Sequence, residues 1–225
     1  MVLFGSMPAL CRWSLLLRAV VGFGLLGGTL SAAPRFATIE EAIARGDLAD
    51  VRAHLAADAA SATRAGKGGL PLHQAILRNK TEIALFLLES GASVDVPDRT
   101  ARTPLHLAVE RGNVALVTAL LERRARPNEQ DGIGWTPLHH AAANNKVAVA
   151  RALLAGGTDP RTLSERGGTP LHEAAASGGV EMVRLLLDAG VDPKVVSKTG
   201  VTALDIAREF KNEAAIAVLS GLAVK

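Results

Sequence analysis

The feature that most restricts the fold of this 225-residue chain is a strict period that runs through most of its length. The tetrapeptide Thr-Pro-Leu-His begins at Thr103, Thr136 and Thr169, which are evenly spaced along the chain. Related tetrapeptides begin in the same phase at Leu70 and Thr202. A period of this length is typical of stacked repeats, in which each unit must cover the apolar face of its neighbours.

Each repeat is predicted to hold two short helices. The Thr is a good N-cap, because its hydroxyl can accept a hydrogen bond from the first helical turn. The Pro that follows loses nothing, since its missing N–H has no helical partner there. In the third unit, the residues expected on the buried faces are Leu105, Ala108 and Val109 in the first helix and Val114, Val117, Leu120 and Leu121 in the second.

Glycine recurs where the second helix ends, at Gly91, Gly157 and Gly190, and Arg124 stands at this phase in the third unit. If the turn is left-handed there, a residue with a Cβ costs roughly 1–2 kcal/mol. We therefore expect the loop at Arg124 to be a weak point. In the same way, Asn145 and Lys211 replace the glycine of the turn between the two helices.

These motifs resemble the ankyrin repeat, whose hallmark is Gly-x-Thr-Pro-Leu-His-x-Ala followed by a Leu-Leu helix and a turn containing Gly. The resemblance implies an all-α solenoid of about six helix-turn-helix repeats, with about twelve short helices. It covers the chain after Ala33, as a domain of residues 34–225. The expected units are residues 34–64, 65–97, 98–130, 131–163, 164–196 and 197–225.

Residues 1–33 have the pattern of a secretory signal peptide. Arg12 and Arg18 precede an uncharged run over residues 19–30, and small residues lead to a cleavage point after Ala33. A membrane-spanning helix needs about 20 apolar residues, so the run is short for that role. We expect the chain to be exported to the periplasm or secreted. An uncleaved leader, anchored in the inner membrane, is the alternative.

Composition excludes several functions. The single cysteine, Cys11, lies in the leader, so the repeats offer no thiolate for catalysis or for zinc. Of the 25 Lys and Arg residues, two lie in the leader, which leaves 23 against 22 Asp and Glu. Such a balance gives no reason to expect nucleic acid as a partner.

One histidine recurs in each of four units, at His73, His106, His139 and His172. Stacked helices lie about 8–10 Å apart, whereas metal ligands must lie about 2 Å from one ion. We therefore expect each His to be buried and hydrogen-bonded to the next repeat. No metal, cofactor or small-molecule substrate is expected. No nucleophile motif is present and a repeat stack offers only a shallow groove, so we expect no enzyme activity.

Ankyrin proteins usually bind partner proteins through a concave surface, formed by the loops before Thr-Pro-Leu-His and by the first helices. Transferred to this sequence, the predicted partner-binding residues are Arg99, Arg102, Arg111, Ile133, Trp135, Asn144 and Arg166. Trp135 is the expected anchor, because the fold needs no aromatic residue there and Trp is enriched at interface hot spots. The alternative is that Trp135 packs on the neighbouring hairpin and anchors nothing.

The function expected from these features is that of an exported, monomeric scaffold or adaptor that binds a protein. The basic residues around Trp135 favour a partner surface that carries carboxylates. A secreted effector that engages a host protein is a second interpretation. A binding module held at the membrane by an uncleaved signal is a third.

Overall fold

The structure, a computed structural model, describes residues 33–66 and 69–222. The predicted signal segment, residues 1–33, lies outside this part except for its last residue. In the described residues there are twelve α-helices and no strand, which confirms the all-α prediction. None of these helices combines the length and the apolar character needed to cross a membrane.

The helices follow one another in six pairs, and a short turn separates the two helices of each pair. A single-turn helix, η2 (Ala59–Ala62), follows the first pair. The pairs are α2 (Ile39–Arg45) and α3 (Leu48–Ala57), α4 (Pro71–Leu77) and α5 (Thr81–Glu89), α6 (Pro104–Arg111) and α7 (Val114–Glu122), α8 (Pro137–Ala143) and α9 (Val147–Ala155), α10 (Pro170–Ser177) and α11 (Val180–Asp188), and α12 (Ala203–Glu209) and α13 (Glu213–Leu222).

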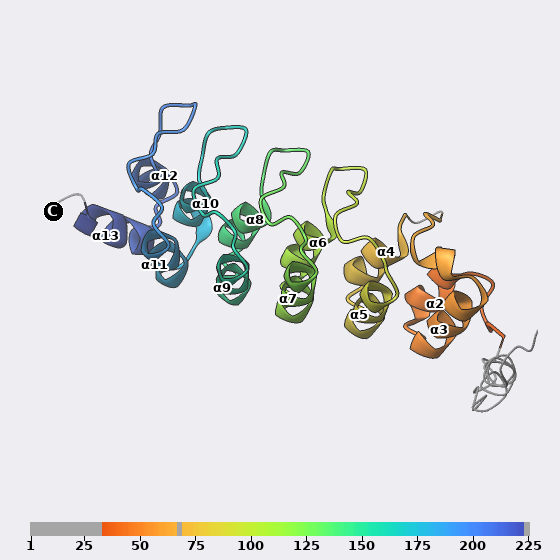
Figure 1. Cartoon of the computed structure of the whole chain (residues 1–225). Helices are drawn as coiled ribbons and strands as arrows, with labels where there is room; N and C mark the ends of the chain where they lie inside the picture. Colours follow the sequence, from red (N-terminus) through yellow and green to blue (C-terminus); the bar gives the residue numbers. More distant parts are fainter. Residues whose placement is uncertain (1–32, 67–68, 223–225) are drawn as a thin grey trace, which may run out of the picture. The chain divides into compact units, whose positions relative to one another are not determined.

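The pairs stack in two rows (Figure 1). The first helices pack in the order α2, α4, α6, α8, α10 and α12, and the second helices in the order α3, α5, α7, α9, α11 and α13. The loops that lead into α6, α8, α10 and α12 extend as fingers beside the row of first helices (Figure 1). The repeat period therefore produces the solenoid that the sequence predicts.

The core lies between the two rows and is built from small aliphatic side chains. Leu105, Val117 and Leu120 are 0% exposed, as predicted. Burying each such side chain contributes about 1.5–3 kcal/mol relative to leaving it in water. Val114 was wrongly placed in the core: it is 38% exposed, because it is the first residue of α7 and the buried face of that helix begins only at Leu116.

The turns have the left-handed backbone that the sequence predicts. Arg124 has a φ of 64°, where the equivalent Gly157 has 87°. Asn145 and Lys211 are also left-handed, with φ of 50° and 55°. Ala101, in a finger loop, has a φ of 59° and occupies the phase of Gly134 and Gly167, which are also left-handed; this turn was not predicted, although the glycine before x-Thr-Pro-Leu-His carries the signal.

Candidate functional site

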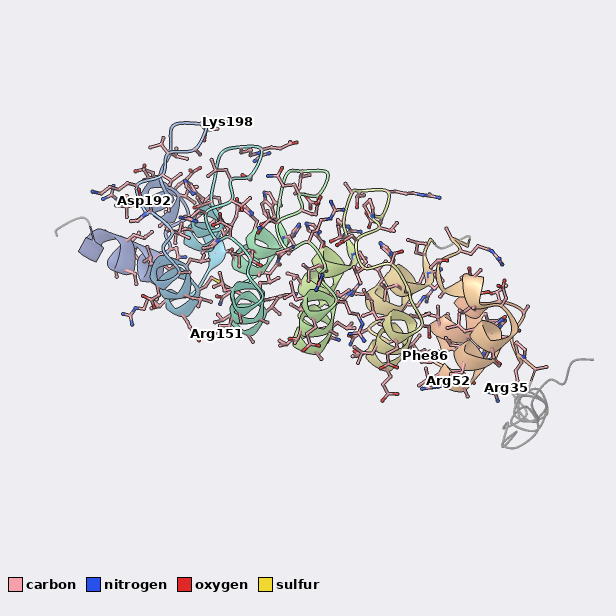
Figure 2. The ribbon with its side chains drawn as sticks, viewed as in Figure 1. Arg35, Arg52, Phe86, Arg151, Asp192 and Lys198 are labelled. Atoms are coloured by element: carbon pink, nitrogen blue, oxygen red, sulfur yellow. The ribbon has the colours of Figure 1, made fainter. Side chains whose placement is uncertain are left out.

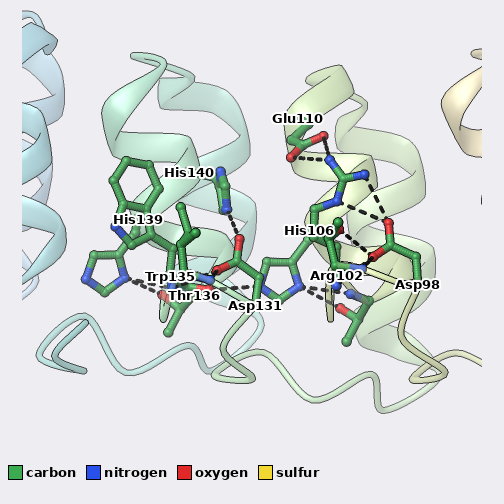
Figure 3. A network of polar contacts seen from close by, with 12 residues as sticks. Asp98, Arg102, His106, Glu110, Asp131, Trp135, Thr136, His139 and His140 are labelled. Atoms are coloured by element: carbon green, nitrogen blue, oxygen red, sulfur yellow. Dashed lines mark hydrogen bonds and ion pairs between the residues drawn. The ribbon is translucent and has the colours of Figure 1, made fainter. Parts of the chain in front are cut away.

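The predicted site lies on a surface that we call the inner face. It consists of the finger loops before α6, α8, α10 and α12 together with the sides of these helices that are not packed in the core. Figure 3 shows its central part, around α6 and α8.

Buried histidines connect each finger loop to the next. In the third unit, the backbone N–H of Thr103 donates to His106 Nδ1 over 3.2 Å. Because Nδ1 accepts, the proton of the neutral ring is on Nε2, and Nε2 donates to the carbonyl oxygen of Trp135 over 3.1 Å. One imidazole thus holds a helix start in its own repeat and a finger loop in the following repeat.

The same contact recurs along the stack, as the sequence predicts. His139 Nε2 donates to the Gly168 carbonyl oxygen over 3.2 Å, and His172 Nε2 lies 3.4 Å from that of Val201. Burial lowers the pKa of His139 to about 4, and the bond to Gly168 opposes this effect only in part. The prediction is wrong for His73, whose ring nitrogens are buried and have no hydrogen-bond partner among the described residues. In that unit Leu70 replaces the Thr whose hydroxyl contacts the ring elsewhere.

Asp131 holds the finger loop that leads into α8. Its Oδ1 accepts hydrogen bonds from the backbone N–H groups of Ile133 (3.1 Å) and Trp135 (2.9 Å). Its Oδ2 lies 2.7 Å from His140 Nε2 (Figure 3). Burial acts most strongly on this carboxyl and favours its neutral form, but the bonds from His140 and the loop outweigh it and lower the pKa of Asp131. Asp131 therefore ties the backbone of this loop, at Ile133 and Trp135, to α8 through His140.

Trp135 is half-buried against α8 (Figure 3). Its ring is stacked on His139, with centroids 6.4 Å apart, and meets His140 edge-on at 5.1 Å. The indole therefore packs on the helix of its own repeat. Ile133, two residues before it, is 59% exposed.

Arg102 occupies the position of Trp135 one repeat earlier. Its guanidinium donates to Asp98 Oδ2 over 3.0 and 3.1 Å and to both carboxylate oxygens of Glu110 over 3.1 Å (Figure 3). Burial again opposes ionisation most strongly, yet bonds from Thr100 and Arg102 lower the pKa of Asp98 to about 2. Arg102 thus connects Asp98 of its own loop to Glu110 of α6, a structural role that was not predicted.

The remaining predicted residues lie on the surface of the inner face. Arg99, Arg111 and Arg166 are exposed and form no ion pair with the described residues. Asn144 is also exposed, and its Nδ2 donates to the His140 carbonyl oxygen over 2.8 Å. Of the predicted residues, Ile133 and Trp135 thus lie on one finger loop, and the arginines lie on other finger loops and at the end of α6.

Two hollows of the described surface lie away from these residues. One, of about 370 Å³, is lined by residues of α9 and α11, including Arg151, whose place on the second-helix row is marked in Figure 2. Another, of about 300 Å³, lies near Lys80 and Gly46. Across the described residues no three His, Cys, Asp or Glu side chains come together in a way that could hold a metal ion.

The fold and this face define a helical repeat protein, in which successive loops and helices present a continuous surface. The chain belongs to the ankyrin-repeat family: the family model described as ankyrin repeats (3 copies) matches residues 39–131, 72–163 and 138–223. A comparison with curated proteins found no match. Ankyrin repeats serve as scaffolds for protein–protein interaction, so the partner of this chain is a protein.

Proposed function

We propose that this protein is a non-catalytic scaffold that holds its partner on the inner face, with Ile133 and Trp135 at the centre of the contact. The observation that carries the proposal is the exposed Ile133, 59% open to solvent, on a loop that Asp131 and His140 hold in place. An apolar side chain on an ordered loop loses little conformational entropy when a partner covers it.

The charges around this centre support a partner surface that carries carboxylates. Arg99, Arg111 and Arg166 are exposed, whereas the charge of Arg102 is matched by Asp98 and Glu110. Exposed charge pairs across an interface are screened by salt. Binding should therefore weaken as ionic strength rises, through the three exposed arginines and not through Arg102.

The hydrogen bonding of the histidines supports a role without catalysis. A general base needs a nitrogen that can reach a substrate proton. In His106 and His139, Nδ1 accepts from the backbone and Nε2 donates to a carbonyl oxygen of the next repeat. Both ring nitrogens of these side chains are therefore hydrogen-bonded within the repeat stack, and neither is free to accept a substrate proton.

Substitutions at the centre of the inner face test the proposal. Partners are captured from the exported fraction with the full chain and identified, and their affinities for variants are then measured by calorimetry. We expect Ile133→Ala to weaken binding by about 2 kcal/mol, as for a buried interface anchor. Val180→Ala is the matched control, because Val180 is 36% exposed and lies on α11, in the row of second helices and outside the inner face. Equal affinities of the wild type and Ile133→Ala would refute the proposed contact.

We also propose that the protein is exported, most simply to a bacterial periplasm, because of the leader pattern that ends at Ala33. Cell fractionation followed by intact mass measurement tests this. A soluble periplasmic chain that begins at Pro34 is the expected result. Full-length protein in the membrane fraction would support the anchored form, and protein in the cytosol would refute export.

A further inference from the structure

The finger loops before α10 and α12 are joined near their tips. The backbone N–H of Lys198 donates to the carbonyl oxygen of Arg166 over 2.9 Å, and the two loops lie next to each other in Figure 1. The same contact joins an earlier pair of fingers, where the N–H of Gly132 donates to Thr100 over 2.9 Å. Arg166 and Lys198 therefore have a fixed register across two successive repeats.

The side chain of Lys198 covers a glycine of the neighbouring finger. Gly167 is buried, and its φ is 73°. A Cβ added there would lie 3.1 Å from Lys198 Cγ, which is closer than side chains normally approach. The aliphatic part of Lys198 thus lies over Gly167, the residue that follows Arg166 in the chain. Figure 2 shows Lys198 at the end of its finger loop.

No carboxylate of the described residues pairs with these two cations. Arg166 and Lys198 are both exposed, and neither forms an ion pair there. Glu165 precedes Arg166, but its side chain covers Gly134 of the preceding finger. Arg166 also acts on the carboxyl group of Glu173, yet burial raises the pKa of Glu173 and the charge of Arg166 opposes that rise only in part. Two neighbouring cations of this kind favour an anion from outside the chain.

Exposed aliphatic side chains lie at the base of the same two fingers. Leu163 is 47% exposed and Val196 is 58% exposed, and they have the same phase in successive repeats. The serine that follows each of them is turned inward: Ser164 is buried and Ser197 is half-buried. The two fingers therefore offer aliphatic groups at their base and positive charge at their tips.

We infer that the fingers before α10 and α12 bind an acidic segment of the partner protein. A carboxylate of this segment lies between Arg166 and Lys198, and an apolar side chain of the same segment covers Leu163 and Val196. The charge orients the segment, and the covered aliphatic surface adds affinity. This inference rests on the proposed function and extends the contact from Ile133 to the last two fingers.

Synthetic peptides test the inference without knowledge of the partner. The full chain is titrated with the amide of N-acetyl-Glu-Leu-Glu-Leu-Glu, and the backbone amide signals of Arg166 and Lys198 are followed by NMR. We expect saturable shifts with a Kd of about 1–10 mM, as for one carboxylate and one aliphatic side chain. A peptide with Gln in place of Glu and one with Ser in place of Leu should each bind at least about threefold more weakly.

Variants on the two fingers complete the test. Lys198→Gln should weaken binding of the acidic peptide at least about threefold. Arg184→Gln is the matched control, because Arg184 is exposed on α11, in the row of second helices, and it should change binding less than about 1.5-fold. Val196→Ser should weaken binding about threefold, whereas Val180→Ser, also on α11, should not. Thermal unfolding of each variant checks that it folds as the wild type does.

Three results would overturn the inference. They are the absence of saturable shifts at Arg166 and Lys198, equal binding of the glutamine peptide, and equal losses in Lys198→Gln and Arg184→Gln. The last result would show that net charge alone attracts the peptide.

Failure of this inference can be distinguished from failure of the proposed function. If the captured partner depends on Ile133 but binds Lys198→Gln as tightly as the wild type, only the contact at the last two fingers is refuted. If the acidic peptide binds at Lys198 while partner binding does not depend on Ile133, the proposed centre of the contact is refuted.

Discussion

The buried histidines make the stability of this protein sensitive to mild acid, and His139 gives the effect that can be calculated. Burial lowers the pKa of His139 to about 4, whereas a histidine in an unfolded chain has a pKa near 6.5. Between these values the unfolded chain binds more protons than the folded chain, so the free energy of unfolding decreases as the pH falls. The stability that the neutral His139 contributes to the folded chain is complete above about pH 6.5 and is lost as the pH falls to about 4.

The two pKa values determine the size of the effect. For His139 alone the free energy of unfolding falls by about 2 kcal/mol at pH 5 and by about 3 kcal/mol at pH 4. The structural cause is visible in the hydrogen bonds, because His139 Nδ1 accepts from the backbone N–H of Thr136 over 3.3 Å and cannot do so when protonated. Burial also lowers the pKa of His106 and of His172, which adds to the loss in the same direction.

Urea unfolding of the full chain, followed by far-UV circular dichroism at pH 7.5 and at pH 5, measures this loss. The variant His139→Gln cannot titrate, so its loss between the two pH values should be smaller than that of the wild type by about 2 kcal/mol. The comparison uses only the change with pH, so any fixed cost of the substitution cancels. Equal losses in the two proteins would refute the reasoning, and unequal slopes against urea would show that the unfolding reactions differ.

Three further predictions concern single residues and are measured by the same urea unfolding at neutral pH. Arg124→Gly should stabilise the chain by about 1 kcal/mol, because it removes a Cβ from a left-handed turn; no gain would refute the predicted weak point. Gly134→Ala should destabilise by more than about 1 kcal/mol, since φ is 76° and the Cβ would lie 2.7 Å from a backbone nitrogen. Arg102→Leu should cost about 1 kcal/mol by leaving the carboxylates of Asp98 and Glu110 half-buried and unpaired, and an unchanged midpoint would contradict this.

The buried histidines that connect successive finger loops show how far repetition in a sequence can predict a structure. The phase of His106 and His139 was enough to predict burial and a bond to the next repeat, because equivalent residues in a stack have equivalent neighbours. The same reasoning failed for His73, where Leu70 breaks the pattern. The period predicts contacts only where the surrounding residues also repeat.

The inner face was harder to predict, since its residues differ from one repeat to the next. The sequence indicates that Arg102 and Trp135 occupy the same kind of position. It does not indicate that Glu110 neutralises Arg102, or that Trp135 packs on His139 and His140. Such contacts depend on side-chain conformations. The same position in the repeat can hold different side chains, and each of them makes different contacts.

The repeat period, the proline that begins α4, α6, α8 and α10, and the glycines of the turns determined the fold of this protein without reference to its structure. They act through local backbone preferences and through nearest-neighbour packing, which are the same in every repeat. Only the tertiary structure decided which charges are matched and which remain available, because ion pairs and partial burial depend on distances between side chains of different elements. For that reason the sequence alone does not show that Asp98 and Glu110 match the charge of Arg102, whereas Arg99, Arg111 and Arg166 stay exposed.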